Sequence, residues 1–159
     1  MDQAEELRNV IKKQNQRTKK PARIITVTSG KGGVGKSNIA VNLAVQFQRM
    51  GLKTIIFDAH IGLANVEVMF GTIPQYSLND LIYHDKEIED IITDGPEGVG
   101  FISGGSGIMG LSNLTLDQIS YLVKSVEKLS VIADIVIVDT GAGISDSVME
   151  FVASSPEIL

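Results

Sequence analysis

The chain has 159 residues, of which 43% are hydrophobic and 21% charged, and its formal net charge is −5. This length fits one domain, and the composition is that of a globular protein rather than a disordered segment. The absence of cysteine excludes disulfides, thiolate zinc sites and cysteine-ligated iron–sulfur clusters within these residues. We expect neither a secretory signal nor a spanning helix in them, because the first residues contain no apolar stretch and no apolar run approaches about 18 residues.

Charge is unevenly distributed along the chain. Residues 1–23 hold seven of the 14 Lys and Arg residues but only three of the 19 acids, so this segment carries +4 and the remainder carries −9. A basic arm on an acidic body indicates an interaction segment. A solvated tail that keeps the protein soluble is the alternative, and charge taken alone favours that alternative.

Apolar spacing predicts alternating helices and strands. A helix is expected over residues 2–14 from the spacing of Ala4, Leu7, Val10 and Ile11. The further expected elements are, in chain order, a strand at 23–29, a helix at 36–51, a strand at 53–58, weak helices near 78–83 and 86–92, a strand at 99–103, a helix opened at 115–118, and strands at 134–139 and from 156. This alternation predicts an α/β fold, with a mostly parallel, doubly wound sheet flanked by helices and preceded by a helical arm.

Two of these segments carry more specific expectations. Residues 115–118 have the form of a capping box, and the helix after them is expected to bury one apolar face, made of Leu116, Ile119, Leu122, Val126 and Leu129. Residues 156–159 look like the first residues of another core strand. We therefore expect this sequence to be a fragment of a longer protein.

Residues 30–37, Gly-Lys-Gly-Gly-Val-Gly-Lys-Ser, satisfy G-x-x-x-x-G-K-[ST] between an expected strand and an expected helix. The glycines let successive backbone N–H groups form an anion-binding nest, and the helix adds the positive end of its dipole. We expect Lys36 to neutralise the β and γ phosphates of ATP and the Ser37 hydroxyl to hold Mg²⁺. The predicted nucleotide-binding residues are Gly30, Lys31, Gly32, Gly33, Val34, Gly35, Lys36, Ser37 and Asn38.

Two aspartates close apolar strands in the same manner. Asp139 ends the run at 135–138 and fits a Walker-B aspartate that holds Mg²⁺ through water, and Asp58 ends the strand at 53–58. A single terminal aspartate is more often a cap or a turn former. Because both occur beside a P-loop, the predicted metal-site residues are Ser37, Asp58 and Asp139.

Lys31 makes this P-loop unusual. It resembles the signature lysine of the deviant Walker A motif in the MinD/ParA family of ATPases, which contacts nucleotide across an ATP-bound dimer. Residues 58–65, Asp-Ala-His-Ile-Gly-Leu-Ala-Asn, look like the first switch of that family, and residues 139–145, Asp-Thr-Gly-Ala-Gly-Ile-Ser, look like its second. The second switch has the form typical of the FlhG branch, also called YlxH or FleN, which controls flagellar number and placement.

Residues 2–8, Asp-Gln-Ala-Glu-Glu-Leu-Arg, resemble the D-Q-A-x-x-L-R activator segment with which that branch stimulates FlhF, a GTPase of the signal-recognition type. The partner-binding residues that this resemblance implies are Asp2, Gln3, Ala4, Leu7 and Arg8. A plain amphipathic helix start, with Asp2 as its N-cap, is the alternative. The match at residues 139–145 favours the activator segment.

The resemblance extends over the whole chain. It implies a basic activator arm at 1–22 and a MinD-like ATPase domain at 23–159 that is incomplete at its C-terminus. It implies ATP and Mg²⁺ as cofactors, hydrolysis that switches a homodimer, and FlhF and flagellar switch-complex proteins as partners. It also implies a cytoplasmic protein whose reversible membrane association depends on a C-terminal helix that these residues do not contain.

His60 departs from the family, which has at this position an aspartate that helps to place the attacking water. Imidazole is neutral or cationic near pH 7 and cannot directly replace a carboxylate, although it can accept one hydrogen bond. We hypothesise that hydrolysis is impaired while ATP binding survives. The expected catalytic positions are Lys31, Lys36 and that of His60.

Two other functions remain open. A hydrolysis-impaired, ATP-sensing scaffold is expected if His60 abolishes turnover. A ParA-type partition ATPase would need a basic surface for DNA, and the charge of −9 outside the arm argues against nucleic acid. An electron carrier of the nitrogenase-reductase type is excluded, because no cysteine is present to ligate its cluster.

Overall fold

The computed structural model describes residues 3–18, 22–28, 35–59, 66–105, 114–140 and 157–158, and it describes side chains for all of these except 12–18 and 157–158. The α-helices in these ranges are α1 (Gln3–Thr18), α2 (Lys36–Arg49), α3 (Val66–Phe70), α4 (Leu78–Tyr83) and α5 (Leu116–Lys128). The strands are β1 (Arg23–Val27), β2 (Thr54–Asp58), β3 (Thr93–Asp94), β4 (Gly100–Ile102), β5 (Ile135–Asp139) and β6 (Glu157–Ile158). Short 3-10 helices are η1 (Ile88–Ile91), η2 (Pro96–Gly98) and η4 (Leu129–Val131).

The strands form one sheet in the order β3-β4-β2-β5-β1-β6. Every neighbouring pair is parallel except β3 and β4, which are antiparallel. The strand β5 lies between β1 and β2, and all five of its residues are buried. A continuous apolar run suits such a strand, because helices cover both faces of a parallel sheet. The predicted fold class, a mostly parallel sheet flanked by helices, is confirmed.

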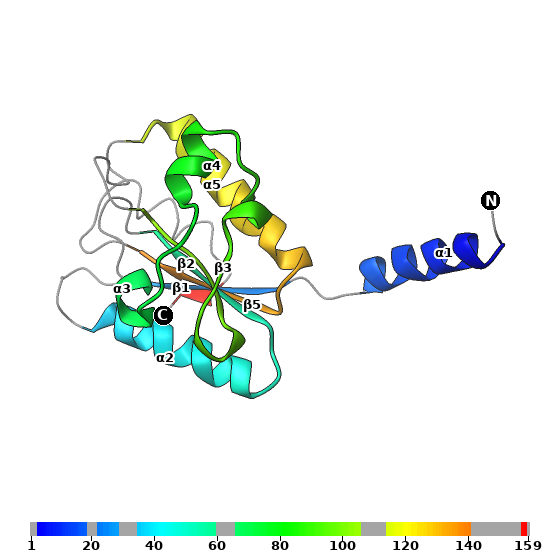
Figure 1. Cartoon of the computed structure of the whole chain (residues 1–159), viewed down its shortest axis with the longest axis horizontal. Helices are drawn as coiled ribbons and strands as arrows, with labels where there is room; N and C mark the ends of the chain where they lie inside the picture. The colour runs from blue at the N-terminus through cyan, green and yellow to red at the C-terminus, as the bar shows by residue number, and fades with distance from the viewer. Residues whose placement is uncertain are drawn as a thin grey trace.

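Helices cover both faces of the sheet (Figure 1), and an apolar cluster lies on each face. On one face, α2 packs through Ala40 and Ala44, which are fully buried and four residues apart, so they lie on one side of the helix. On the other face, α4 and α5 bury Leu78, Leu81 and Leu122. The small side chains of α2 let this helix lie close to the sheet, which holds its first residues beside the strand ends.

Most predicted elements are confirmed within a few residues of their predicted ends, and the strand expected from residue 156 is β6, paired with β1. The segment expected near 86–92 forms the 3-10 helix η1 rather than an α-helix. The prediction missed α3 and β3, because segments of five and two residues are too short for apolar periodicity to register. Within the described ranges, no helix combines the length and apolar character needed to cross a membrane.

The predicted apolar face of α5 is wrong at Leu116, whose side chain is 72% exposed. The capping box at Thr115 is present, with the Gln118 N–H donating to Thr115 Oγ1 at 3.2 Å. The residue buried at this end of the helix is Leu114, which precedes the cap and joins the same apolar cluster as Ile119. These are the two positions of a hydrophobic staple. The chain therefore enters the helix through Leu114, and Leu116 is left on the solvent side.

The helix α1 lies apart from the sheet and its covering helices in Figure 1. Its apolar residues Leu7, Val10 and Ile11 are 61, 57 and 48% exposed. They occupy positions i, i+3 and i+4 and so form one stripe along the helix. An isolated helix of about 15 residues is only marginally stable in water. The stripe is therefore an uncovered face that suits packing against another surface.

Candidate nucleotide site

The ends of β2 and β5 meet the beginning of α2 at the carboxyl edge of the sheet. Parallel strands end at the same edge, and Asp58 and Asp139 are register partners in the β2–β5 pair. Contacts between α2 and both strands hold Lys36 and Ser37 against this edge. Ligands bind in open α/β sheets at the carboxyl ends of the strands. The P-loop helix and both predicted strand-end aspartates are thus brought together.

Gly35 permits the turn into α2. Its φ of +79° is in the left-handed region, where glycine avoids the strain that other residues meet. A Cβ at this position would find nothing within 4 Å, so the requirement is conformational rather than spatial. Gly35 also occupies the N-cap position and has no side chain to cap the helix. The first-turn N–H groups of α2 can therefore serve an anion.

Lys36 is the centre of a buried ionic contact. Its Nζ donates to Asp139 Oδ1 at 2.5 Å and also to the Thr140 carbonyl oxygen. The side chain of Lys36 is 7% exposed and that of Asp139 is fully buried. A buried charge is tolerated when it is paired and hydrogen-bonded. Lys36 and Asp139 therefore depend on each other in the folded protein.

The second oxygen of Asp139 accepts a hydrogen bond from Ser37. Ser37 Oγ lies 2.7 Å from Asp139 Oδ2. Both carboxylate oxygens of Asp139 are thus engaged by consecutive residues of the P-loop helix. A hydroxyl and a carboxylate are hard oxygen donors of the kind that Mg²⁺ prefers.

Asp58 is fully buried beside Asp139 but has a different partner. Its Oδ2 accepts a hydrogen bond from the Val66 N–H at 3.0 Å, at the first residue of α3. The carboxylate therefore ties the end of β2 to the beginning of α3. This contact makes Asp58 a helix-terminus acceptor as well as a predicted metal-site residue.

The oxygen donors at this edge fit a Mg²⁺ ion that keeps several waters and binds the phosphates of a nucleotide. The described residues include no group of three His, Cys, Asp or Glu side chains able to hold a metal by themselves. A dedicated protein cage is thus not found in that part of the chain. The fit is instead to an ion held by Ser37, strand-end carboxylates and phosphate oxygens.

Thr140 was not among the predicted site residues. It is fully buried, its carbonyl accepts from Lys36, and its Oγ1 donates to the Val27 carbonyl at 3.0 Å. The Ala59 N–H donates to the Asp139 carbonyl at 2.8 Å. These contacts join the ends of β1, β2 and β5. The signals in the sequence were the position of Thr140 directly after Asp139 and its place in the predicted second switch, residues 139–145.

The other predicted site residues fall into three groups. Asn38 is exposed in the first turn of α2. The residues that lie outside the described ranges are Asp2, Gly30, Lys31, Gly32, Gly33, Val34 and His60. The residues that lie in α1, exposed and away from the Lys36–Asp139 contact, are Gln3, Ala4, Leu7 and Arg8. Binding roles for all of them stay predictions.

Comparison with known proteins finds similar sequences over most of the chain. Residues 20–157 match the ParA family, described as NUBPL iron-transfer P-loop NTPase. The chain is 40% identical to the antiactivator FleN of Pseudomonas aeruginosa, over 87% of this chain and 50% of that protein. It is 35% identical to the flagellum site-determining protein YlxH of Helicobacter pylori, over 97% of this chain and 54% of that protein. The chain thus spans about half the length of these relatives.

Among solved structures, the septum site-determining protein MinD of Pyrococcus horikoshii, in complex with Mg-ADP, superposes with a TM-score of 0.71. It is 26% identical in sequence, and the match covers 86% of this chain and 56% of that chain. The structural match to MinD therefore covers about as much of this chain, 86%, as the sequence match to FleN, 87%.

Proposed function

The chain belongs to the ParA/MinD-type family of P-loop NTPases, with FleN and YlxH as relatives, and we propose a function on that basis. The protein is an ATP-dependent switch in the control of flagellar number and placement. The observation that carries the proposal is the Asp139 carboxylate, which binds Lys36 through one oxygen and Ser37 through the other. In this arrangement the P-loop lysine, the metal-binding hydroxyl and the Walker-B carboxylate form one connected group.

Each residue of this group has a distinct task in the proposed mechanism. The Lys36 side chain would move from Asp139 to the phosphates, where its ammonium neutralises their charge. Ser37 and Asp139 would hold Mg²⁺, and Asp58 supplies a second carboxylate beside them. Bound Mg²⁺ would supply positive charge beside the phosphate oxygens. Catalysis by these residues consists of positioning and charge stabilisation.

We propose that ATP also controls assembly. Lys31, outside the described residues, would contact the nucleotide of a second copy, so that ATP favours a homodimer and hydrolysis disfavours it. His60 stands where the family has an aspartate, and it would slow the hydrolytic step. An ATP-sensing scaffold with impaired hydrolysis is thus the second candidate function. Turnover measured with and without His60→Asp separates the two candidates. Hydrolysis by the unsubstituted protein supports the switch ATPase, whereas hydrolysis seen only in His60→Asp supports the scaffold.

The arm at residues 1–22 is proposed to activate a GTPase of the FlhF type. The exposed stripe of α1, with Gln3 and Arg8 on the same helix, supports a role in partner binding. Flagellar switch-complex proteins are proposed as further partners of the longer protein. Membrane association is proposed only through a segment beyond these residues, and the charge of −9 outside the arm disfavours DNA as a ligand.

Two measurements test the proposal. Binding of MgATP to the chain is expected to be lost in Lys36→Gln, whereas the control Lys53→Gln, in the turn before β2, should bind normally. A synthetic peptide of residues 1–20 is expected to stimulate GTP hydrolysis by purified FlhF, and Gln3→Ala in the peptide should abolish the stimulation. Absence of stimulation would reduce the proposal to an ATPase without this partner.

A further inference from the structure

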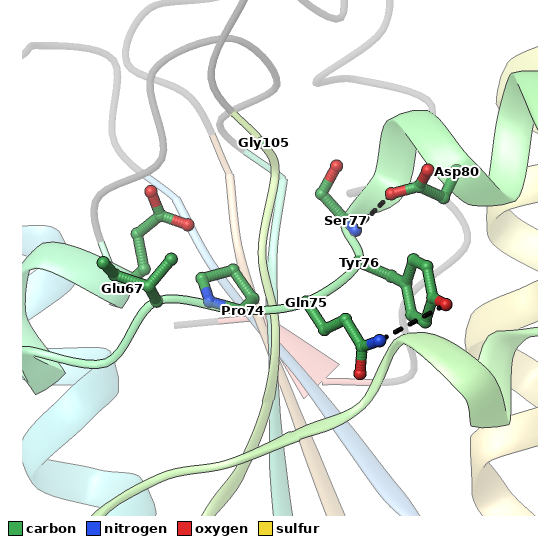
Figure 2. A pocket seen from close by; sticks show the side chains of 8 residues that line it. Glu67, Pro74, Gln75, Tyr76, Ser77, Asp80 and Gly105 are labelled. Carbon is green, nitrogen blue, oxygen red and sulfur yellow. Dashed lines mark hydrogen bonds between the residues drawn. The ribbon is translucent and has the colours of Figure 1, made fainter.

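A hollow of about 180 Å³ opens beside α3. None of its lining residues belongs to the predicted nucleotide site. Figure 2 shows Glu67 of α3 on one side and Ser77 with Asp80 of α4 on the other, with Pro74 and Gln75 on the segment between them. We call this hollow the α3 pocket.

Hydrogen bonds hold the walls of the α3 pocket in place. Ser103 Oγ donates to Glu67 Oε2 at 2.6 Å, and the Ser103 carbonyl accepts from the Leu78 N–H at 2.9 Å. The end of β4 thereby joins α3 to α4. Gly105 allows the close approach at the base, because a Cβ there would lie 2.8 Å from Ser77 Oγ. The pocket is thus a built shape in the folded protein.

The chemistry of the α3 pocket suits a cation beside an apolar side chain. Glu67 and Asp80 contribute two carboxylates. Both Asp80 oxygens have partners, the Ser77 N–H and His84 Nδ1, whereas Glu67 Oε1 accepts no hydrogen bond from the described residues. The Tyr76 ring already binds a cation, the Lys86 ammonium, at 4.5 Å from its centroid. On the rim, the Ile73 side chain is 94% exposed. An arginine next to an apolar residue would complement these groups.

The helix α1 carries this complementary chemistry. Arg8 directly follows Leu7, the first residue of the exposed apolar stripe. The segment of residues 1–23 carries +4 against −9 for the rest of the chain. Opposite net charges attract the arm to the body, and the stripe gains stability when it is covered.

The chain is long enough for this contact to form within one molecule. The rise from Leu7 to Thr18, eleven residue positions later, is about 17 Å as helix, at about 1.5 Å per residue. Residues 19–22, if extended, add about 17 Å between Thr18 and Arg23. The strand β1 separates the two edges of the sheet by only about 13 Å, at about 3.3 Å per residue. The first half of α1 can therefore reach the carboxyl edge.

We infer that α1 folds back onto its own body, with Arg8 at the Glu67 and Asp80 carboxylates and Leu7 on Ile73. The inference rests on the proposed function of the arm, because docking covers the residues through which α1 would bind its partner GTPase. The docked arm is an autoinhibited state. Glu67 directly follows Val66, which Asp58 binds, so the docking site and the nucleotide site share α3.

Disulfide trapping in the intact chain tests the inference, and the absence of cysteine gives a clean background. The pair Leu7→Cys with Ile73→Cys is expected to form an intramolecular disulfide under mild oxidation, seen as a faster-migrating monomer band on a non-reducing gel. The control pair is Leu7→Cys with Met50→Cys. Met50 is 71% exposed and lies just before β2 at the edge where the arm is attached.

An arm that only samples the surface would meet Met50 at least as often as Ile73. We expect the Ile73 pair to oxidise about tenfold faster, because docking raises the effective concentration of its thiols. Equal rates, or a disulfide-linked dimer in place of the monomer, would overturn the inference.

Charge exchange with the same cysteine pair tests the placement of Arg8. In the Leu7→Cys, Ile73→Cys background, Arg8→Glu should slow trapping by about two- to fivefold, the effect of one exposed ion pair. Adding Glu67→Lys should restore the rate, whereas Arg17→Glu, an equal charge change farther along the arm, should leave it unchanged. Failure of the restoration would contradict the placement of Arg8. Trapping does not involve FlhF, so its failure is distinct from failure of the proposed function.

Discussion

The ends of β2 and β5 make an instructive comparison, because each closes with a fully buried aspartate and the two are register partners. Asp139 binds two side chains of the P-loop helix, Lys36 and Ser37. Asp58 binds the Val66 backbone N–H at the start of α3. The same residue type at the same position in adjacent strands thus binds the P-loop helix in one case and the start of α3 in the other. The segment that each strand end meets in space, rather than the strand itself, sets the role of the aspartate.

The largest effect is expected from breaking the contact at Asp139. Asp139→Ala leaves the buried Lys36 ammonium without its carboxylate, and loss of one partner of a buried pair costs about 3–5 kcal/mol. Urea denaturation of the chain measures this change. An unchanged free energy of unfolding would show that Lys36 finds another partner in the folded state.

An intermediate effect is expected at Asp58. Asp58→Ala removes the acceptor at the start of α3 and is expected to lower the free energy of unfolding by about 1–2 kcal/mol, as does loss of a helix cap. Asp58→Asn keeps an oxygen acceptor and should lose less. Both variants are expected to weaken Mg²⁺-dependent ATP binding, because both remove the carboxylate charge. A loss of metal dependence in only the alanine variant would assign Asp58 to the helix alone.

A smaller effect on stability is expected at Ser37. Ser37→Ala removes one hydrogen bond to Asp139, with a net cost of about 1 kcal/mol. Its effect on function should be larger than its effect on folding, because the hydroxyl would also hold Mg²⁺. When ATP binding is measured at fixed ATP over a range of Mg²⁺ concentrations, the Mg²⁺ concentration at half-maximal binding should be higher in Ser37→Ala. Ser125→Ala, which removes a hydroxyl of α5 bonded within its own helix, is the matched control.

The smallest effect is expected at the surface ion pair between Arg49 and Glu97, whose side chains are 58 and 44% exposed. Glu97→Gln should change the free energy of unfolding by less than about 1 kcal/mol, since solvent and salt screen exposed pairs. This variant sharpens the contrast with the buried Lys36–Asp139 pair. A cost at Glu97 equal to that at Asp139 would mean that burial does not govern the difference.

Much of the site was predictable from the sequence alone. The P-loop pattern, its place between a strand and a helix, and the apolar run ending in Asp139 predicted the edge at which Lys36, Ser37 and the two aspartates lie. These signals are local, because a glycine-rich turn and a buried parallel strand each leave a characteristic pattern in consecutive residues. The same reasoning predicted β6 from a few apolar residues.

Other features became visible only in three dimensions. Leu116 has helical spacing with Ile119, yet Leu114 is the residue buried at that end of α5. Thr140 bonds Lys36 and Val27, which are distant from it in sequence. The α3 pocket combines Glu67, Ser77 and Gly105 from three separate segments.

The amino-acid sequence by itself determined the α/β class and the family, and it predicts a phosphate-binding turn, since spacing and glycine content act between near neighbours in the chain. Only the tertiary structure decided which aspartate binds Lys36 and which binds the start of α3. It also decided which apolar residues stay exposed on α1. These outcomes depend on which segments meet in space, and burial and hydrogen bonding between distant residues leave no pattern along the chain.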